Sequence, residues 1–265
     1  MDQHSAISLV ARLAAVGVIV ACAEFIADPR PLQNQGLMSW KVGQLRNGWL
    51  TASESPLDPV LRYPNVLAVV GLRMLLAAVI LFAPTALLRS AWFVTPAALL
   101  NAVFILRTAY GHDGADQMAW IIFSGLAIIN LVGTPFAETV YLWFLALQAC
   151  LAYVTTGLAK ASASHWRNGS CLVGILGTSI YGHAGLAELL RRNPTFGRLL
   201  APLLIVWQCS FPMVLVAPAP VGFVILGIGV LFHLTNAYFM GLNTFVWSFL
   251  ATYPAIIFCI QTRGW

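Results

Sequence analysis

Long apolar runs, separated by short polar stretches, make up most of the chain. A membrane-spanning helix needs roughly 20 mostly apolar residues. The runs that predict such helices are residues 7–27, 65–87, 91–106, 117–131, 137–160, 196–216, 221–238 and 242–260. The pattern therefore predicts an all-α fold, a polytopic integral membrane helical bundle of about eight spans. No internal repeat or soluble region interrupts the pattern, so residues 1–265 are expected to form a single transmembrane helical domain.

Two longer interruptions are expected to lie at the membrane surface. Residues 28–63 form the longest polar stretch, which contains four prolines together with Trp40 and Trp49. Tryptophan is typical of headgroup depth, so we expect an interfacial segment there. Residues 166–194 contain five glycines among apolar and charged residues, which predicts a re-entrant or surface-lying piece.

The composition supports a membrane protein and excludes several other classes. Apolar residues make up 60% of the chain and charged residues only 9%, whereas a soluble domain carries about 25% charged residues. Too few charges exist to cover a water-facing surface, which excludes a soluble globule and a disordered tail. The net charge of +5 comes from basic residues scattered singly, so no nucleic acid partner is expected. The expected partners are the lipids of the cell (inner) membrane.

The distribution of basic residues leaves the orientation open. With the N-terminus in the cytoplasm, three basic residues in the loops and at the ends of the spans lie on the cytoplasmic side and nine on the other side. The positive-inside rule favours the opposite orientation, with the polar loops in the cytoplasm. Arginines that serve a site would escape this rule, and both orientations therefore remain.

Ionisable residues close to the spans are the main candidates for chemistry, because a charge at the bilayer centre costs at least about 2.5–3.5 kcal/mol. The first candidates form a polar cluster between two spans: His112, Asp113, Asp116 and Gln117. His112 titrates near neutral pH, and either aspartate could orient its ring. The alternative is a turn at Asp113 followed by a helix with Asp116 as its N-cap. The five cysteines are isolated, so no metal or dithiol centre is predicted.

Three further ionisable residues lie within a predicted span or at its end. Lys160 ends the fifth span, where a desolvated amine can act as a base, although a lysine at a helix end can also extend to the membrane surface. His233 lies in the seventh span near Asn236, either as a catalytic residue or as a hydrogen-bonded packing residue. Arg73 lies in the second span, with Glu24 as the expected partner of a structural ion pair.

Several short motifs, taken in order, resemble one known family. They are His112-Asp113-Gly114-Ala115-Asp116-Gln117, Tyr153-x-x-x-Gly157-x-x-Lys160, His165-Trp166-x-x-Gly169, Phe232-His233-Leu234 and Met240-Gly241-Leu242-x-x-Phe245. Over about residues 73–254, the chain resembles the membrane domain of vitamin K-dependent gamma-carboxylase and its bacterial relatives, the horizontally transferred transmembrane domain (HTTM) proteins. It is also similar to the sporulation-delaying protein B type, which is found with peptide-toxin systems.

The resemblance implies a quinol-dependent enzyme. In the carboxylase, a lysine at the place of Lys160 is the weak base that deprotonates reduced vitamin K, and oxygenation then yields a stronger base and an epoxide. The implied cofactor is a reduced quinone of the menaquinone or vitamin K type, and His112 is implied to stabilise developing charge. The residues expected to bind substrate or line its cavity are Arg73, Asp113, Asp116, Gln117, Trp166, His233 and Asn236.

The chain also departs from the carboxylase pattern. It has no large extramembrane region after the last span, and the segment between Lys160 and Trp166 is one residue longer. We therefore expect quinol-linked oxygenation or base chemistry on a small peptide or a lipid, with carboxylation itself not implied. The expected partners are a small peptide substrate and a soluble partner protein, and the sequence leaves open whether that partner supplies the absent region. The alternative is a non-catalytic membrane factor for the maturation or export of a peptide toxin or a similar small peptide.

Overall fold

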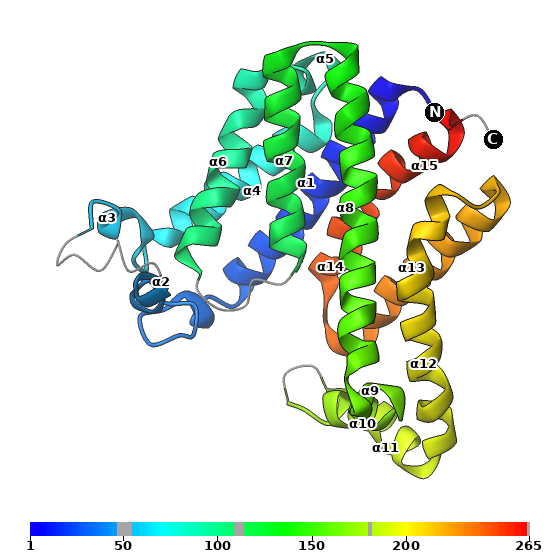
Figure 1. Ribbon diagram of the computed structural model, residues 1–265. Helices are drawn as coiled ribbons and strands as arrows, with labels where there is room; N and C mark the ends of the chain where they lie inside the picture. Colours follow the sequence, from blue (N-terminus) through cyan, green and yellow to red (C-terminus); the bar gives the residue numbers. More distant parts are fainter. Residues whose placement is uncertain (47–54, 109–113, 180–181, 264–265) are drawn as a thin grey trace. The chain divides into compact units, whose positions relative to one another are not determined.

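The structure, a computed structural model, describes residues 1–46, 55–108, 114–179 and 182–263, and every regular element in these ranges is a helix (Figure 1). Six helical segments among them are long and apolar enough to cross a membrane: Gln3–Ala27, Gly114–Val132, Pro135–Ser162, Pro194–Leu215, Ala219–Met240 and Asn243–Thr262. Two shorter apolar helices, Val66–Phe82 and Ala91–Arg107, coincide with the other two predicted spans. The all-α prediction is confirmed, and a total of eight spans stays a prediction.

Contacts divide the chain into two compact units, each of which is described by itself. The N-terminal unit comprises residues Asp2–Tyr141 and Trp247–Pro254. The C-terminal unit comprises Met1, Leu142–Val246 and Ala255–Trp265. Helix α8 begins in the first unit and continues in the second.

The N-terminal unit is a helical bundle in which α1 packs against α4 and α7, and α6 packs against both α4 and α7. Its helices are α1 (Gln3–Ala27), η1 (Arg30–Leu32), α2 (Trp40–Arg46), α3 (Asp58–Leu61), α4 (Val66–Phe82), α5 (Thr85–Leu88), α6 (Ala91–Arg107), α7 (Gly114–Val132), the first turns of α8 (Pro135–Ser162) and the end of α14 (Asn243–Leu250). Small residues on α1 allow close packing. A Cβ atom added at Gly17 would lie 3.1 Å from the Cβ of Trp247 on α14.

The polar stretch between α1 and α4 is held by Arg107, the last residue of α6. Its guanidinium is fully buried and donates to the carbonyl oxygens of Leu32 at 2.8 Å, Leu61 at 3.0 Å and Met38. A guanidinium carries five N–H donors in a fixed fork, so one arginine can hold three separate turns of chain. The described residues of this stretch around Leu32, Met38 and Leu61 are therefore tied to the end of α6.

Trp40 is a core residue of this stretch, and its position at headgroup depth stays a prediction. It is buried, packs with Leu61, and donates from Nε1 to Oδ1 of Asp58 at 2.6 Å. Asp58 also accepts from Gln44 at 3.0 Å. Because an acceptor inside the stretch satisfies the indole N–H, the ring can be buried. Trp49, the other expected interfacial tryptophan, lies outside the described residues.

The C-terminal unit consists of the second part of α8 together with short and long helices. They are α9 (Ser164–Arg167), α10 (Ser170–Leu176), α11 (Ala184–Arg192), α12 (Pro194–Ser210), η3 (Phe211–Leu215), α13 (Ala219–Met240) and most of α15 (Tyr253–Thr262). Both α12 and α13 pack against η3, which connects them. Short helices α9 and α10 also pack against the beginning of α12.

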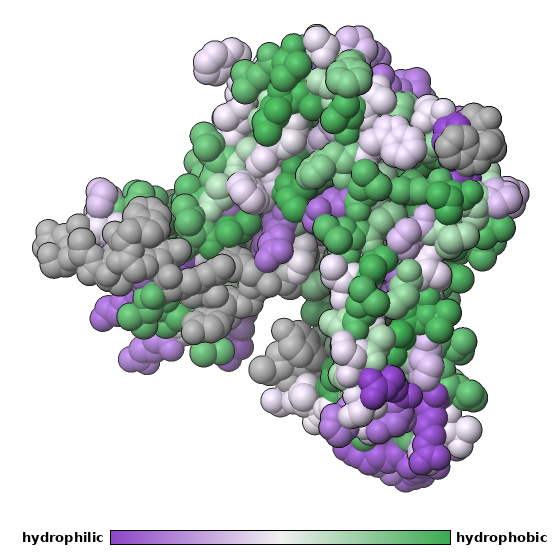
Figure 2. Space-filling view, in the orientation of Figure 1, coloured by the Kyte–Doolittle hydropathy of each residue, from purple (hydrophilic) through white to green (hydrophobic). Residues whose placement is uncertain are grey.

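Helix α11 is amphipathic, which fits the surface-lying alternative for residues 166–194. Its apolar residues Ala187 and Leu190 are buried against Leu176 of α10. On the other face, Glu188 accepts from Arg192 at 2.9 Å and pairs with Arg191 at 3.4 Å. Figure 2 shows hydrophilic side chains gathered over α9–α11 at one end of the unit. A helix with one apolar and one charged face is suited to a membrane surface.

Candidate functional site

A cavity of about 630 Å³ lies in the C-terminal unit between α8, α12 and α13, and α9, α10 and α11 contribute to its wall. Most of its lining is leucine, isoleucine, phenylalanine and tryptophan. The polar side chains among the lining residues are Lys160, Gln208, Thr235 and Asn236. Ligand sites in proteins typically have volumes of about 300–1,000 Å³, with apolar walls and a few placed polar groups. The cavity has both properties and is the candidate site.

Lys160 is the charged residue of this cavity. Its Nζ donates to Oε1 of Gln208 at 2.9 Å and lies 5.0 Å from the ring centroid of Trp166. In the part of the chain that the structure describes, Lys160 forms no ion pair with a carboxylate. The side chain is half-buried and held between an amide and an aromatic face. This geometry favours a cavity residue over a lysine that extends freely to the membrane surface.

Gly157 explains why Gln208 lies beside Lys160. It precedes Lys160 by three residues, and a Cβ atom added there would lie 2.8 Å from Sγ of Cys209 and 3.0 Å from Cβ of Gln208. The missing side chain allows α12 to approach α8 closely at this point. The two residues of the sequence motif therefore act together. Gly157 allows α12 to approach α8, and Lys160 forms a hydrogen bond to Gln208 on α12.

Replacing Gly157 with valine is expected to lower the free energy of unfolding by about 1–3 kcal/mol, because the added carbons overlap α12 and force it away. The measurement is thermal unfolding in detergent, followed by circular dichroism. Gly227→Val in α13 is the matched control, because a Cβ atom there meets nothing within 4 Å and the helix propensity changes equally. Equal destabilisation by the two substitutions would contradict the role assigned to Gly157.

His233 is a packing residue of the C-terminal unit in this structure. It is buried on α13, and its Nε2 lies 2.7 Å from Oη of Tyr153 on α8. The Tyr153 ring is stacked on Phe211 with centroids 3.9 Å apart, and its edge meets Trp207 at 5.2 Å. His233 is not among the residues that line the cavity, whereas the neighbouring Trp207 is. The geometry thus favours the packing alternative.

Three of the residues expected to act at the site meet in this cavity. Lys160, Trp166 and Asn236 come from α8, α9 and α13, and all line the same space. Sequence reasoning missed Gln208, which is almost fully buried and bonds to Lys160. The sequence did contain a signal for Gln208, because a single amide inside an apolar span is costly to bury, as a single charge is.

Arg73 belongs to a separate buried cluster in the N-terminal unit. It is 2% exposed and donates to Oδ1 of Asn101 at 2.8 and 3.2 Å and to Oδ1 of Asp116 at 3.2 Å. Its guanidinium also lies 4.3 Å from the ring centroid of Phe104. The structure confirms a structural ion pair, with Asp116 as the acidic partner in place of the expected Glu24. Asn101, a lone amide in apolar α6, was missed.

The remaining members of the polar cluster at residues 112–117 are placed only in part. Asp116 lies in the first turn of α7, which begins at Gly114, and so is a helical residue and not the N-cap. Gln117 is exposed on the same helix. His112 and Asp113 lie outside the described residues.

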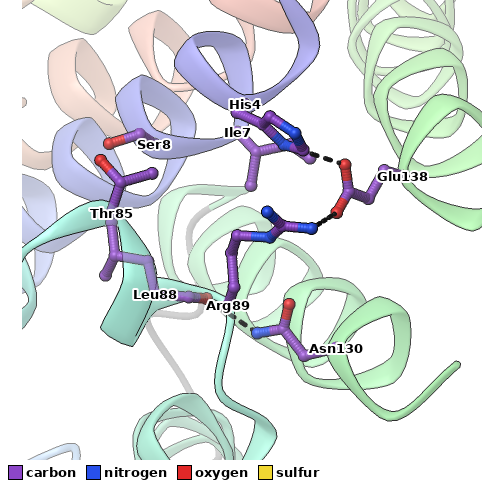
Figure 3. Close-up of a pocket in the computed structure, with 8 residues that line it drawn as sticks. All are labelled: His4, Ile7, Ser8, Thr85, Leu88, Arg89, Asn130 and Glu138. Atoms are coloured by element: carbon purple, nitrogen blue, oxygen red, sulfur yellow. Dashed lines mark hydrogen bonds and ion pairs between the residues drawn. The ribbon is translucent and has the colours of Figure 1, made fainter. Parts of the chain in front are cut away.

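A second, much smaller polar cavity of about 10 Å³ lies in the N-terminal unit (Figure 3). Glu138 in the first turn of α8 is buried there, 3.2 Å from Nδ1 of His4 and 3.3 Å from Nη2 of Arg89. Asn130 of α7 donates to the carbonyl oxygen of Leu88 at 2.8 Å. The space suffices for about one water molecule. We therefore assign this cluster a structural role, joining the ends of four helices.

No family model, curated protein or solved structure matches the chain. Among the described residues, no group of three or more histidine, cysteine, aspartate or glutamate side chains could hold a metal ion. Long apolar helices are compatible with an integral membrane protein.

Proposed function

We propose that this integral membrane protein of the cell (inner) membrane is an enzyme that binds a reduced quinone in the cavity of its C-terminal unit. Lys160 accepts the proton of a ring hydroxyl. The observation that carries the proposal is the position of Lys160, a single amine in an apolar, aromatic-walled cavity with no carboxylate among its lining residues. A basic group in such surroundings is suited to accept a proton from a lipophilic acid.

The surroundings of Lys160 support the charge that this step creates. Once protonated, the amine keeps its hydrogen bond to Oε1 of Gln208, and its charge faces the ring of Trp166. Both groups are already in place before the proton arrives, so they stabilise the ammonium without reorganising. Trp207 and Phe232 line the same cavity and offer flat faces to an aromatic ring. The donor set and the volume therefore fit a quinol head group.

A bound quinol would itself react with O₂, and this oxygenation is the chemistry that it would supply. The overall balance of that reaction is quinol plus O₂ giving quinone epoxide plus water. The proposed substrate is a small peptide or a lipid, which is deprotonated by the stronger base that forms during oxygenation of the quinol. The proposed protein partner is a soluble protein. A non-catalytic maturation or export factor for a small peptide is the competing function.

The test is to incubate the purified protein in detergent with reduced menaquinone and O₂ and to measure the epoxide by mass spectrometry. The chain has only two lysines, Lys41 and Lys160, which provides a matched pair of variants. Lys160→Ala is expected to lower epoxide formation at least about a hundredfold, the usual contribution of a general base. Lys41→Ala, on α2 in the N-terminal unit, is expected to leave it unchanged.

Two results would overturn the proposal. One is epoxide formation that Lys160→Ala does not reduce, since Lys160 would then not be the base. The other is a folded, quinol-binding wild-type protein that forms no epoxide. The second result would favour the maturation or export factor, and co-purification with a small peptide would then be the next measurement.

A further inference from the structure

Two residues on the cavity wall also lie on the outside of the C-terminal unit. Leu203 of α12 and Leu231 of α13 both line the cavity, and they are 65% and 66% exposed. Ile228, one turn before Leu231, lines the cavity as well and is 43% exposed. The cavity therefore reaches the outer surface between α12 and α13.

This opening lies on helices that are long and apolar enough to span a membrane. Both α12, extended by η3 to Leu215, and α13 are candidate spans, and α13 buries mainly one face of its surface. The rim is aliphatic, and the hydroxyl of Thr235 next to it donates to the carbonyl oxygen of Leu231 at 2.6 Å. A rim without free polar groups on a spanning helix is suited to hydrocarbon and not to water.

Helices α10 and α11 form the wall of the cavity toward the charged surface. Leu172 and Leu176 of α10 and Leu186 of α11 contribute apolar side chains to the wall. The opposite face of α11 carries Arg191 and Arg192, both exposed and paired with Glu188. Helix α10 and the apolar face of α11 thus lie between the cavity and the side where hydrophilic residues gather (Figure 2).

We propose that the gap between α12 and α13 is a lateral portal, through which a long hydrocarbon chain of the ligand extends into the bilayer. Leu203, Ile228 and Leu231 form its rim. The ligand is then a membrane-resident amphiphile with an isoprenoid or acyl chain that enters from the lipid phase. This inference rests on the proposed function of the same cavity and adds the chemical class and the route of its ligand.

The experiment narrows the portal with Leu203→Trp and, separately, Leu231→Trp. Binding is measured for menaquinol, which has a long isoprenoid chain, and for menadiol, the same ring without the chain. Both variants are expected to weaken menaquinol binding at least tenfold and to change menadiol binding less than twofold. The matched controls are Leu199→Trp and Leu234→Trp, which lie on the same helices, 62% and 49% exposed, and do not line the cavity. They are expected to change neither affinity.

Equal weakening of both quinols by the portal variants, or no weakening of either, would overturn the portal. Failure of the wild type to bind either quinol would overturn the proposed function instead. In that case, the binding of spin-labelled stearate tests the portal independently of quinol binding. Stearate binding that is at least tenfold weaker in Leu203→Trp and Leu231→Trp than in the wild type supports the portal. Unchanged binding in these variants, or no stearate binding by the wild type, overturns the portal.

Discussion

Replacing Asp116 with asparagine is expected to lower the free energy of unfolding of the N-terminal unit by about 3–5 kcal/mol. The substitution keeps the size of the side chain and removes its charge. Arg73 then stays buried with its positive charge uncompensated, because the amide oxygens at positions 101 and 116 and the ring of Phe104 carry no negative charge. The measurement is unfolding in detergent micelles by heat or by titration with a denaturing detergent. Gln117→Glu, one residue further on and exposed, is the control and is expected to change stability by less than about 0.5 kcal/mol.

A double variant separates the ion pair from packing. Arg73→Met combined with Asp116→Leu removes both charges and keeps apolar volume, so it is expected to recover most of the stability lost in Asp116→Asn. A double variant that is less stable than the single one would contradict this account. It would show that the cluster is required for more than mutual neutralisation.

Replacing Arg107 with methionine has the second large expected effect. The substitution leaves the carbonyl oxygens of Leu32, Met38 and Leu61 without their donor. Hydrogen bonds to a charged group contribute about 1.5–3 kcal/mol each, and their losses overlap, so we expect a total on the order of 4 kcal/mol. The stretch at residues 28–63 should also become more sensitive to limited proteolysis, because its attachment to α6 is lost.

Two controls make this result specific. Arg62→Met removes an arginine from the same stretch whose side chain is about half exposed and paired with Asp58, and is expected to cost less than about 1 kcal/mol. Arg107→Lys retains the charge but not the forked donors, so it is expected to recover only a minor part of the loss. Full stability of Arg107→Lys would contradict the role assigned to the three separate hydrogen bonds.

The helices were predictable because hydrophobic run length is a local property of the chain. Predicted runs at residues 7–27 and 137–160 correspond to α1 (Gln3–Ala27) and α8 (Pro135–Ser162), within a few residues at each end. The burial of Trp40 could not be predicted, because it depends on Asp58, a residue 18 positions further along. A hydrogen-bond acceptor supplied by a later turn cannot be read from the local pattern.

Three members of the candidate site were predictable from the sequence, and one of their neighbours was not. Lys160, Trp166 and Asn236 were expected to act at the site, and they share one cavity. Gln208 was not expected, since it comes from a helix 48 residues later and is positioned by the close approach at Gly157. The acidic partner of Arg73 was also misassigned, because the approach of Asp116 on α7 to Arg73 on α4 depends on how separate helices pack.

The sequence by itself determined that this is an all-helical protein whose apolar segments are suited to a membrane, and it marked the costly polar residues within them. These properties follow from run length and from the cost of burying charge, which are additive along the chain. Only the tertiary structure decided which polar residues meet: Lys160 with Gln208 and Arg73 with Asp116. It also decided that a cavity opens between α12 and α13. Pairings and cavities depend on how separate helices pack, and packing is set by many weak contacts between distant residues.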